Sequence, residues 1–150
     1  FVFVFVFFGL VAVSGTYYVQ GLSWPPDIFL AGAALGALNT AILVANNLRD
    51  IETDAKVGKR TLAVRIGTRS SQVEYLTLLL VAAVVPVVGW LVYDWPAASL
   101  AALLVAPLCV APVRRVLTHT EPVQLLPALG ETARVVGVYG LLFGLGLAIG

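Results

Sequence analysis

The chain has 150 residues, of which 60% are hydrophobic and 11% are charged, and its mean hydropathy is +0.98. An ordinary soluble domain carries about 25% charged residues, so this composition excludes a water-soluble fold. The net charge of +1 gives no reason to expect a nucleic-acid partner. Because each crossing of a bilayer needs about 20 residues, the length allows about five transmembrane helices.

Long charge-free stretches predict where those helices lie. The apolar runs lack the period of two that barrel strands would need, so we expect an all-α membrane protein. In chain order, the helices are expected at residues 1–20, 28–54, 71–92, 96–117 and 132–150. Pro107 and Pro112 predict a kink in the fourth helix. Gly32 and Gly36 have the small-residue spacing that allows close helix packing.

Basic residues divide the connections between these helices into two kinds. The short turns at residues 21–27 and 93–96 contain no Lys or Arg. All nine basic residues lie elsewhere: Arg49, Lys56, Lys59, Arg60, Arg65, Arg69, Arg114, Arg115 and Arg134. By the positive-inside rule, the connections that hold them are cytoplasmic. The sequence therefore predicts a cytoplasmic N-terminus and a C-terminus on the opposite side.

The polar segment after the second helix, NNLRDIETDAKVGKRTLAVRIG at residues 46–67, carries the chemistry. In a continuous helix, a rotation of about 100° per residue places Asn46, Asp50, Asp54 and Asn47 at roughly 0°, 40°, 80° and 100°. Arg49 and Glu52 would point away from this arc. Carboxylates two turns apart with amides beside them suit a hard cation such as Mg²⁺, which keeps water ligands and bridges phosphates.

A glycine and a basic run follow this acidic face. Gly58 predicts a helix stop, and Lys59, Arg60, Arg65 and Arg69 come soon after it. Such a run would neutralise a leaving pyrophosphate while carboxylates hold the metal. Membrane topology alone also explains basic residues after a span, and acidic residues there are often solvated or paired. The residues by themselves leave both interpretations open.

The same segment resembles a known family motif. It is similar to the second aspartate-rich motif of the UbiA-type intramembrane prenyltransferases, and among them to the 1,4-dihydroxy-2-naphthoate polyprenyltransferases of menaquinone synthesis. The matching parts are the paired asparagines, the DxxxD of Asp50 and Asp54, and GKRTLAVRIG. GTYYVQ at residues 15–20 and ETARVVGVYG at residues 131–140 are similar to the same family. The likeness covers essentially the whole chain.

The resemblance implies a nine-helix all-α bundle with two aspartate-rich cytoplasmic motifs. Residues 1–150 would then be the C-terminal portion of a single prenyltransferase domain, a partial copy of the bundle that contains helices five to nine. The first motif, of the NDxxDxxxD kind, has no match in this sequence. We therefore expect the missing N-terminal half of the enzyme as a partner, and no catalysis by the 150 residues alone.

The resemblance also implies a reaction in a multi-pass protein of the cell membrane, with the site in a cytoplasmic loop. A polyprenyl group would pass from its diphosphate to 1,4-dihydroxy-2-naphthoate, with loss of CO₂ and pyrophosphate, giving demethylmenaquinone. Mg²⁺ would be the cofactor. The expected catalytic metal ligands are Asp50 and Asp54, supported by Asn46 and Asn47, and the expected diphosphate ligands are Lys59 and Arg60. Tyr17 and Tyr18 would line the tail or form an interfacial belt.

Two alternatives remain at this stage. A UbiA-type enzyme for another aromatic or tetrapyrrole acceptor would need the same diphosphate chemistry, so the metal motif does not discriminate between acceptors. A membrane transporter fragment is the alternative from another class. Transport pathways usually place ionisable residues near the middle of the membrane, whereas the charges here stop at the rim of the spans. That position favours chemistry on an amphiphile.

Overall fold

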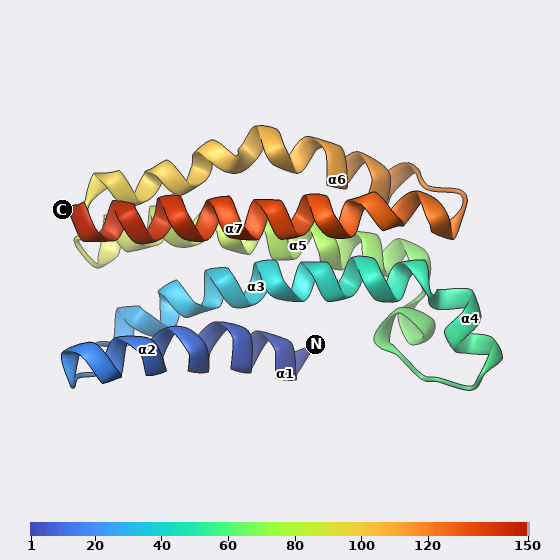
Figure 1. The fold of residues 1–150 in the computed structure, drawn as a ribbon, viewed down its shortest axis with the longest axis horizontal. Helices are drawn as coiled ribbons and strands as arrows, with labels where there is room; N and C mark the ends of the chain where they lie inside the picture. The colour runs from blue at the N-terminus through green and yellow to red at the C-terminus, as the bar shows by residue number, and fades with distance from the viewer. Residues whose placement is uncertain (150) are drawn as a thin grey trace.

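The computed structural model describes residues 1–149, and no strand occurs among them. The elements in chain order are α1 (Val2–Phe5), the π-helical stretch η1 (Val6–Val11), α2 (Ala12–Gly21), α3 (Pro26–Arg49), α4 (Ile51–Lys56), α5 (Leu62–Val92), the 3₁₀ helix η2 (Ala97–Val105), α6 (Ala106–Thr118), η3 (Pro122–Leu125) and α7 (Leu126–Ile149). Figure 1 shows long helical segments lying side by side, with α4 projecting at one end.

Five of these segments are long and apolar enough to cross a membrane. They are Val2–Gly21, Pro26–Arg49, Leu62–Val92, Ala97–Thr118 and Pro122–Ile149, and they contain 20 to 31 residues each. At 1.5 Å per residue, 20 residues span about 30 Å, the thickness of a bilayer core. The predicted all-α fold with five transmembrane helices is therefore confirmed.

The helix bounds differ from the predicted ones in three segments. The third segment begins at Leu62 and not at residue 71, with a break at Gly67, where φ is +80°. The fifth begins with η3 at Pro122 and not at residue 132. The second does not run unbroken to residue 54, because α3 ends at Arg49.

The fourth segment changes helix type along its length. Its first nine residues form η2, and α6 begins at Ala106. Pro107 lies in the first turn of α6, where a missing backbone N–H costs no hydrogen bond. The helix type thus changes directly before Pro107, and Pro112 lies inside α6, while the proline kink itself stays a prediction.

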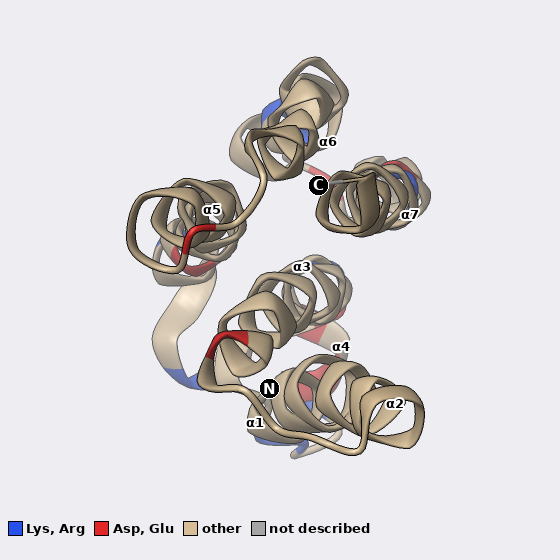
Figure 2. Cartoon of the chain, turned by 90° about the vertical axis from the view of Figure 1, so that its left-hand side faces the viewer, with Lys and Arg blue, Asp and Glu red and all other residues tan. Residues whose placement is uncertain are grey.

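Helix α3 lies at the centre of the molecule. It packs against the first segment, α5 and α7, an arrangement visible in the view along the bundle (Figure 2). Twelve of its 24 residues are buried, most of them small. Gly9 crosses α3 so closely that a Cβ atom added to it would lie 2.5 Å from the Cα of Gly36 and 2.6 Å from the carbonyl oxygen of Gly32. The predicted packing role of these glycines is confirmed.

Hydrogen bonds between side chains and neighbouring helices fix the arrangement. The Tyr75 hydroxyl of α5 bonds the Thr132 hydroxyl of α7 at 2.8 Å, and the Tyr139 hydroxyl donates to the Ala82 carbonyl at 2.8 Å. At the end opposite α4, Trp95 Nε1 donates to Asp27 Oδ2 at 2.8 Å. These bonds satisfy polar groups that would be costly to leave unpaired away from water.

The two ends of the bundle differ in charge. Figure 1 places α4, the start of α5 and the connection from α6 to α7 at one end, and the turns at residues 21–25 and 93–96 at the other. Eight of the nine basic residues lie near this first end: at the end of α3, in α4 and the loop after it, near the start of α5, or near the end of α6. The ninth, Arg134, lies in the half of α7 that starts at this end, and the two turns contain none. The fold therefore has the alternation of connections on which the predicted topology depends.

Candidate functional site

A bend at Asp50 separates the end of α3 from α4. Asp50 has φ −94° and ψ 7°, outside helical geometry, although its N–H still bonds the Asn46 carbonyl at 3.1 Å. The chain continues helically beyond it, since the Asp54 N–H bonds the Asp50 carbonyl at 2.8 Å. The Thr53 hydroxyl donates to the same carbonyl at 2.9 Å. The bend therefore redirects the helix while keeping its backbone groups paired.

Asp50 forms a two-pronged ion pair with the residue before it. Arg49 Nε donates to Oδ1 and Arg49 Nη2 donates to Oδ2, both at 2.7 Å. This guanidinium holds the pKa of the Asp50 carboxyl below its usual range, against the opposing effect of partial burial. Asp50 is therefore kept ionised. The expectation that Arg49 points away from the acidic residues was wrong, because the bend at Asp50 breaks the even rotation on which it relied.

Asp54 is buried, with 7% of its surface exposed. Its Oδ1 accepts a hydrogen bond from Lys59 Nζ at 3.1 Å, whereas its Oδ2 is buried and has no hydrogen-bond partner among residues 1–149. Leaving a buried polar atom unpaired costs about 1–3 kcal/mol. Asp54 thus has one carboxylate oxygen that is available to accept a hydrogen bond or to bind a cation.

The turn at Gly58 brings Lys59 back over Asp54. Helix α4 ends in a Schellman motif, in which the Lys59 N–H bonds the Asp54 carbonyl at 2.8 Å and the Gly58 N–H bonds the Ala55 carbonyl at 3.2 Å. This motif requires a left-handed residue, and Gly58 has φ +74°. Thr61 then caps the start of α5, where its hydroxyl accepts a hydrogen bond from the Val64 N–H at 3.3 Å.

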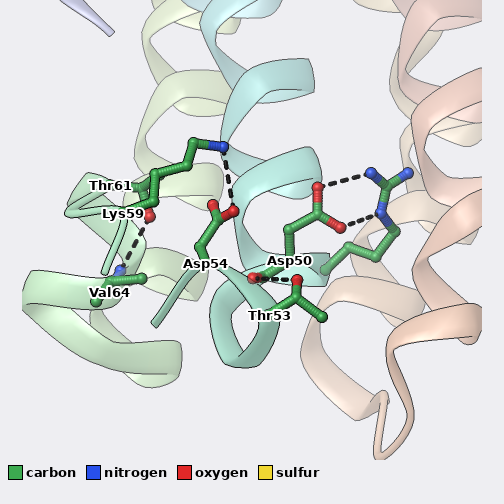
Figure 3. Close-up of polar contacts among 7 residues, drawn as sticks. Asp50, Thr53, Asp54, Lys59, Thr61 and Val64 are labelled. Atoms are coloured by element: carbon green, nitrogen blue, oxygen red, sulfur yellow. Dashed lines mark hydrogen bonds and ion pairs between the residues drawn. The ribbon is translucent and has the colours of Figure 1, made fainter. Parts of the chain in front are cut away.

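Figure 3 shows how the side chains of this segment lie together. Asp50, which caps α4, and Asp54, within α4, project toward the same side, and Lys59 approaches Asp54 from one flank. The Lys59 side chain is 59% exposed, so its ammonium group can also reach an anion in solvent. Arg60 is exposed and forms no ion pair within residues 1–149. Glu52 is exposed on α4, whereas Asp54 is buried.

The two asparagines lie in different surroundings. Asn47 is buried, with 8% of its surface exposed. Asn46 lines an open groove of about 310 Å³ together with Asn39 and Ile42 of the same helix and Phe8 of the first segment. No hydrogen bond within the described residues joins either asparagine side chain to Asp50 or Asp54. The structure thus places Asp50, Asp54 and Lys59 in and directly around α4, with Lys59 bonded to Asp54, and Asn46 lies one helical turn earlier at the end of α3.

Comparison with known proteins gives the evolutionary context of this segment. The model of the UbiA prenyltransferase family matches residues 1–148. The chain belongs to the UbiA prenyltransferase family. Among curated UbiA relatives, a 1,4-dihydroxy-2-naphthoate octaprenyltransferase of Mycobacterium tuberculosis is 44% identical over 147 residues, which cover 98% of this chain and 49% of the relative.

Two further relatives carry the same description. The protein of Haemophilus influenzae is 40% identical, with 98% of this chain and 48% of the relative covered. The protein of Escherichia coli is 36% identical, with 96% and 47% covered. The chain therefore spans about half the length of the curated UbiA relatives it matches. No solved structure matches it.

The donor set of this UbiA chain fits part of a metal site. UbiA prenyltransferases generally depend on a divalent metal, and the free Oδ2 of Asp54 and the ionised carboxylate of Asp50 are hard oxygen ligands of the kind that Mg²⁺ accepts. Residues 1–149 contain no group of three or more His, Cys, Asp or Glu side chains that could hold an ion. The remaining ligands would come from phosphate oxygens, water or another segment.

Sequence reasoning missed two features of this region. The Arg49–Asp50 pair depends on the bend, and the sequence gives no sign of a bend in an otherwise helical polar stretch. Asn39 lies seven residues before Asn46 and shares its groove, with its amide bonded to the Leu35 carbonyl at 2.9 Å. The spacing of seven, two helical turns, was a usable signal that Asn39 and Asn46 share a face.

Proposed function

We propose that this chain forms part of a membrane enzyme that transfers a polyprenyl group from its diphosphate to 1,4-dihydroxy-2-naphthoate, forming demethylmenaquinone. The observation that carries the proposal is the buried Asp54 carboxylate, which has one oxygen held by Lys59 and one oxygen without a partner. Three relatives described as 1,4-dihydroxy-2-naphthoate octaprenyltransferases support the choice of acceptor.

Asp50 and Asp54 would hold the cation that accompanies the diphosphate, and we propose Mg²⁺. Bound there, Mg²⁺ would stabilise the negative charge that develops on the departing pyrophosphate. Asn46, next to the bend, would orient phosphate oxygens or bound water, and the buried Asn47 would support the end of α3. Asp54 alone would be left with an unmatched oxygen, so the cation also removes an energetic cost of the fold.

Lys59 and Arg60 would bind the diphosphate itself. In the described state the Lys59 ammonium neutralises Asp54. When a cation occupies that carboxylate, the long and mostly exposed Lys59 side chain is free to turn to a phosphate oxygen without moving its backbone. Arg60 is exposed beside it and is not engaged in an ion pair with any described residue. Together they would offset much of the charge of the leaving group.

Two adjoining grooves offer a path for the prenyl tail. The groove at Asn46 is mostly apolar and includes Phe8, and a second groove of about 660 Å³ shares Phe8 and continues along the first segment past Tyr17 to Gln20. A tail that begins at the phosphate site would lie between the first segment and α3. Tyr17 would contact the tail there. Tyr18 is exposed beside Trp24 and would instead belong to an aromatic belt.

The location follows from the distribution of charge. We propose that the protein lies in the cell membrane with α4 in the cytoplasm, because eight of the nine basic residues lie near the end of the bundle that carries α4 and the turns at the other end hold none. The diphosphate site would then face soluble cytoplasmic reactants. We further propose that an N-terminal half supplies the first aspartate-rich motif, since relatives are about twice as long.

The test is a membrane assay of the full-length protein with radiolabelled polyprenyl diphosphate and 1,4-dihydroxy-2-naphthoate. We expect labelled demethylmenaquinone when Mg²⁺ is present and none after chelation, with activity restored by added Mg²⁺. Parallel reactions with other aromatic acceptors test the choice of substrate. Product formation that continues in excess chelator would contradict the metal role, and turnover only with another acceptor would contradict the naphthoate assignment.

A further inference from the structure

A concave site of about 770 Å³ lies beside α6 and the loop that follows it, and none of the proposed diphosphate ligands lines it. One face of α6 forms its wall. Pro107, Val110 and Ala111 supply the apolar part of that face, and Arg114 and Thr118 continue it toward the end of the bundle that carries α4. Val110 and Ala111 lie three and four residues after Pro107, and Arg114 and Thr118 follow at the same spacings, so these side chains lie on one side of the helix.

The polar part of the site holds donors that no described acceptor uses. Arg114 is exposed and forms no ion pair within residues 1–149. Arg115 donates through Nε to both carboxylate oxygens of Glu131 at 3.0 Å, which leaves its Nη groups for another acceptor. Gln124 Oε1 accepts from the Thr120 N–H at 2.8 Å, so the amide NH₂ of Gln124 remains a donor.

The surrounding loop is held in place. His119 Nδ1 donates to the Val116 carbonyl at 2.8 Å, and Gln72 of α5 donates to the same carbonyl at 2.9 Å. The bond from Thr120 to Gln124 closes the loop over the end of α6. The donors of the site are therefore presented by an ordered segment, which lowers the entropy lost when a ligand binds.

Charge and polarity together define the ligand. Glu131 offsets Arg115, so Arg114 supplies the one uncompensated positive charge among the groups described, which suits a singly charged phosphodiester better than a multiply charged diphosphate. The wall changes from apolar to basic along a membrane-spanning segment. A phospholipid has the same sequence of apolar chain and charged headgroup.

We propose that this concave site binds one anionic phospholipid, whose phosphate contacts Arg114, Arg115 and Gln124 and whose acyl chain lies along Pro107, Val110 and Ala111. The inference concerns a site separate from the proposed catalytic one and does not depend on the proposed function. A bound lipid would brace the connection between α6 and α7 at the membrane surface.

The test is native mass spectrometry of the delipidated full-length protein in detergent, titrated with phosphatidylglycerol, phosphatidylcholine or glycerol 3-phosphate. We expect one phosphatidylglycerol to bind more tightly than the other two ligands. Arg114→Ala should weaken that binding about fivefold, since a basic residue near a membrane surface contributes about 1 kcal/mol. Val110→Trp should weaken it as well, by filling the apolar part of a site in which Val110 is 65% exposed.

Arg134→Ala is the matched control, because Arg134 is an exposed arginine of α7 that does not line the site. We expect it to leave phosphatidylglycerol binding unchanged. Equal effects of Arg114→Ala and Arg134→Ala would overturn the proposal. So would equal affinity for phosphatidylcholine, which would remove the charge requirement. Tighter binding of glycerol 3-phosphate than of the lipid would mean a free-phosphate site and would also overturn it.

Discussion

At the residue scale, the candidate site depends on two backbone features, one at each end of the short helix α4. The bend at Asp50 pairs its carboxylate with Arg49, and the left-handed Gly58 brings Lys59 to Asp54. The acidic residues, the helix stop at Gly58 and the basic run were all predictable from residue type and spacing. The pairing of individual charges was not, because it depends on backbone angles at single positions in α4 and at its ends.

Gly58→Ala tests the role of that left-handed position. A Cβ atom at φ +74° meets no neighbour within 4 Å, but it strains the backbone by about 1–2 kcal/mol. We expect the turn to shift, Lys59 to lose its position over Asp54 and kcat/KM for prenyl transfer to fall about tenfold, as in Lys59→Ala. Steady-state assays of the full-length protein would measure both variants.

Gly130→Ala is the control for this substitution. Gly130 lies inside α7, and an added Cβ there also meets nothing within 4 Å, so alanine should be accommodated without strain. Activity should then match that of the unsubstituted protein. An equally active Gly58→Ala variant would show that the turn does not position the diphosphate ligand.

At the element scale, apolar runs identified each membrane segment but underestimated the helices at their polar ends. Residues 62–70, apart from the break at Gly67, and residues 122–131 are helical although they contain charged and polar side chains, because a helix can continue past the apolar core of the membrane. Thr61 caps the first of these extensions through the Val64 N–H. In the sequence, the only sign of the change from η2 to α6 was the pair of prolines at residues 107 and 112.

Gly9→Ala tests the close crossing of the first segment over α3. The added Cβ would lie 2.5 Å from the Cα of Gly36, so the two helices must separate. Overpacking of this kind costs about 1–3 kcal/mol. We expect a lower thermal unfolding temperature in detergent, by several degrees. Gly15→Ala, where the new atom meets nothing within 4 Å, should unfold at the original temperature. Equal unfolding temperatures for the two variants would contradict the packing.

At the scale of the whole molecule, the two ends of the bundle should face opposite sides of the membrane. Reporter fusions after Trp24 and Asp94 are expected to report an extracytoplasmic location, and fusions after Lys56 and Thr120 a cytoplasmic one. The reason is that the first two turns hold no basic residue, whereas the other two connections lie in the basic end. A cytoplasmic signal at Trp24 would reverse the topology and place α4 on the wrong side for cytoplasmic reactants.

The central claim is that the two aspartates around α4 serve a metal-dependent prenyl transfer. The most direct measurement compares Asp50→Ala, Asp54→Ala and Glu52→Ala in the full-length protein, using the Mg²⁺-dependent formation of labelled demethylmenaquinone. Glu52 is the internal control, because it lies between the two aspartates but is exposed on α4. We expect each aspartate variant to lose at least 99% of the rate, on the order of 3 kcal/mol of transition-state stabilisation, while Glu52→Ala keeps most of it. Equal loss in Glu52→Ala and Asp54→Ala, at equal protein levels in the membrane, would contradict the account.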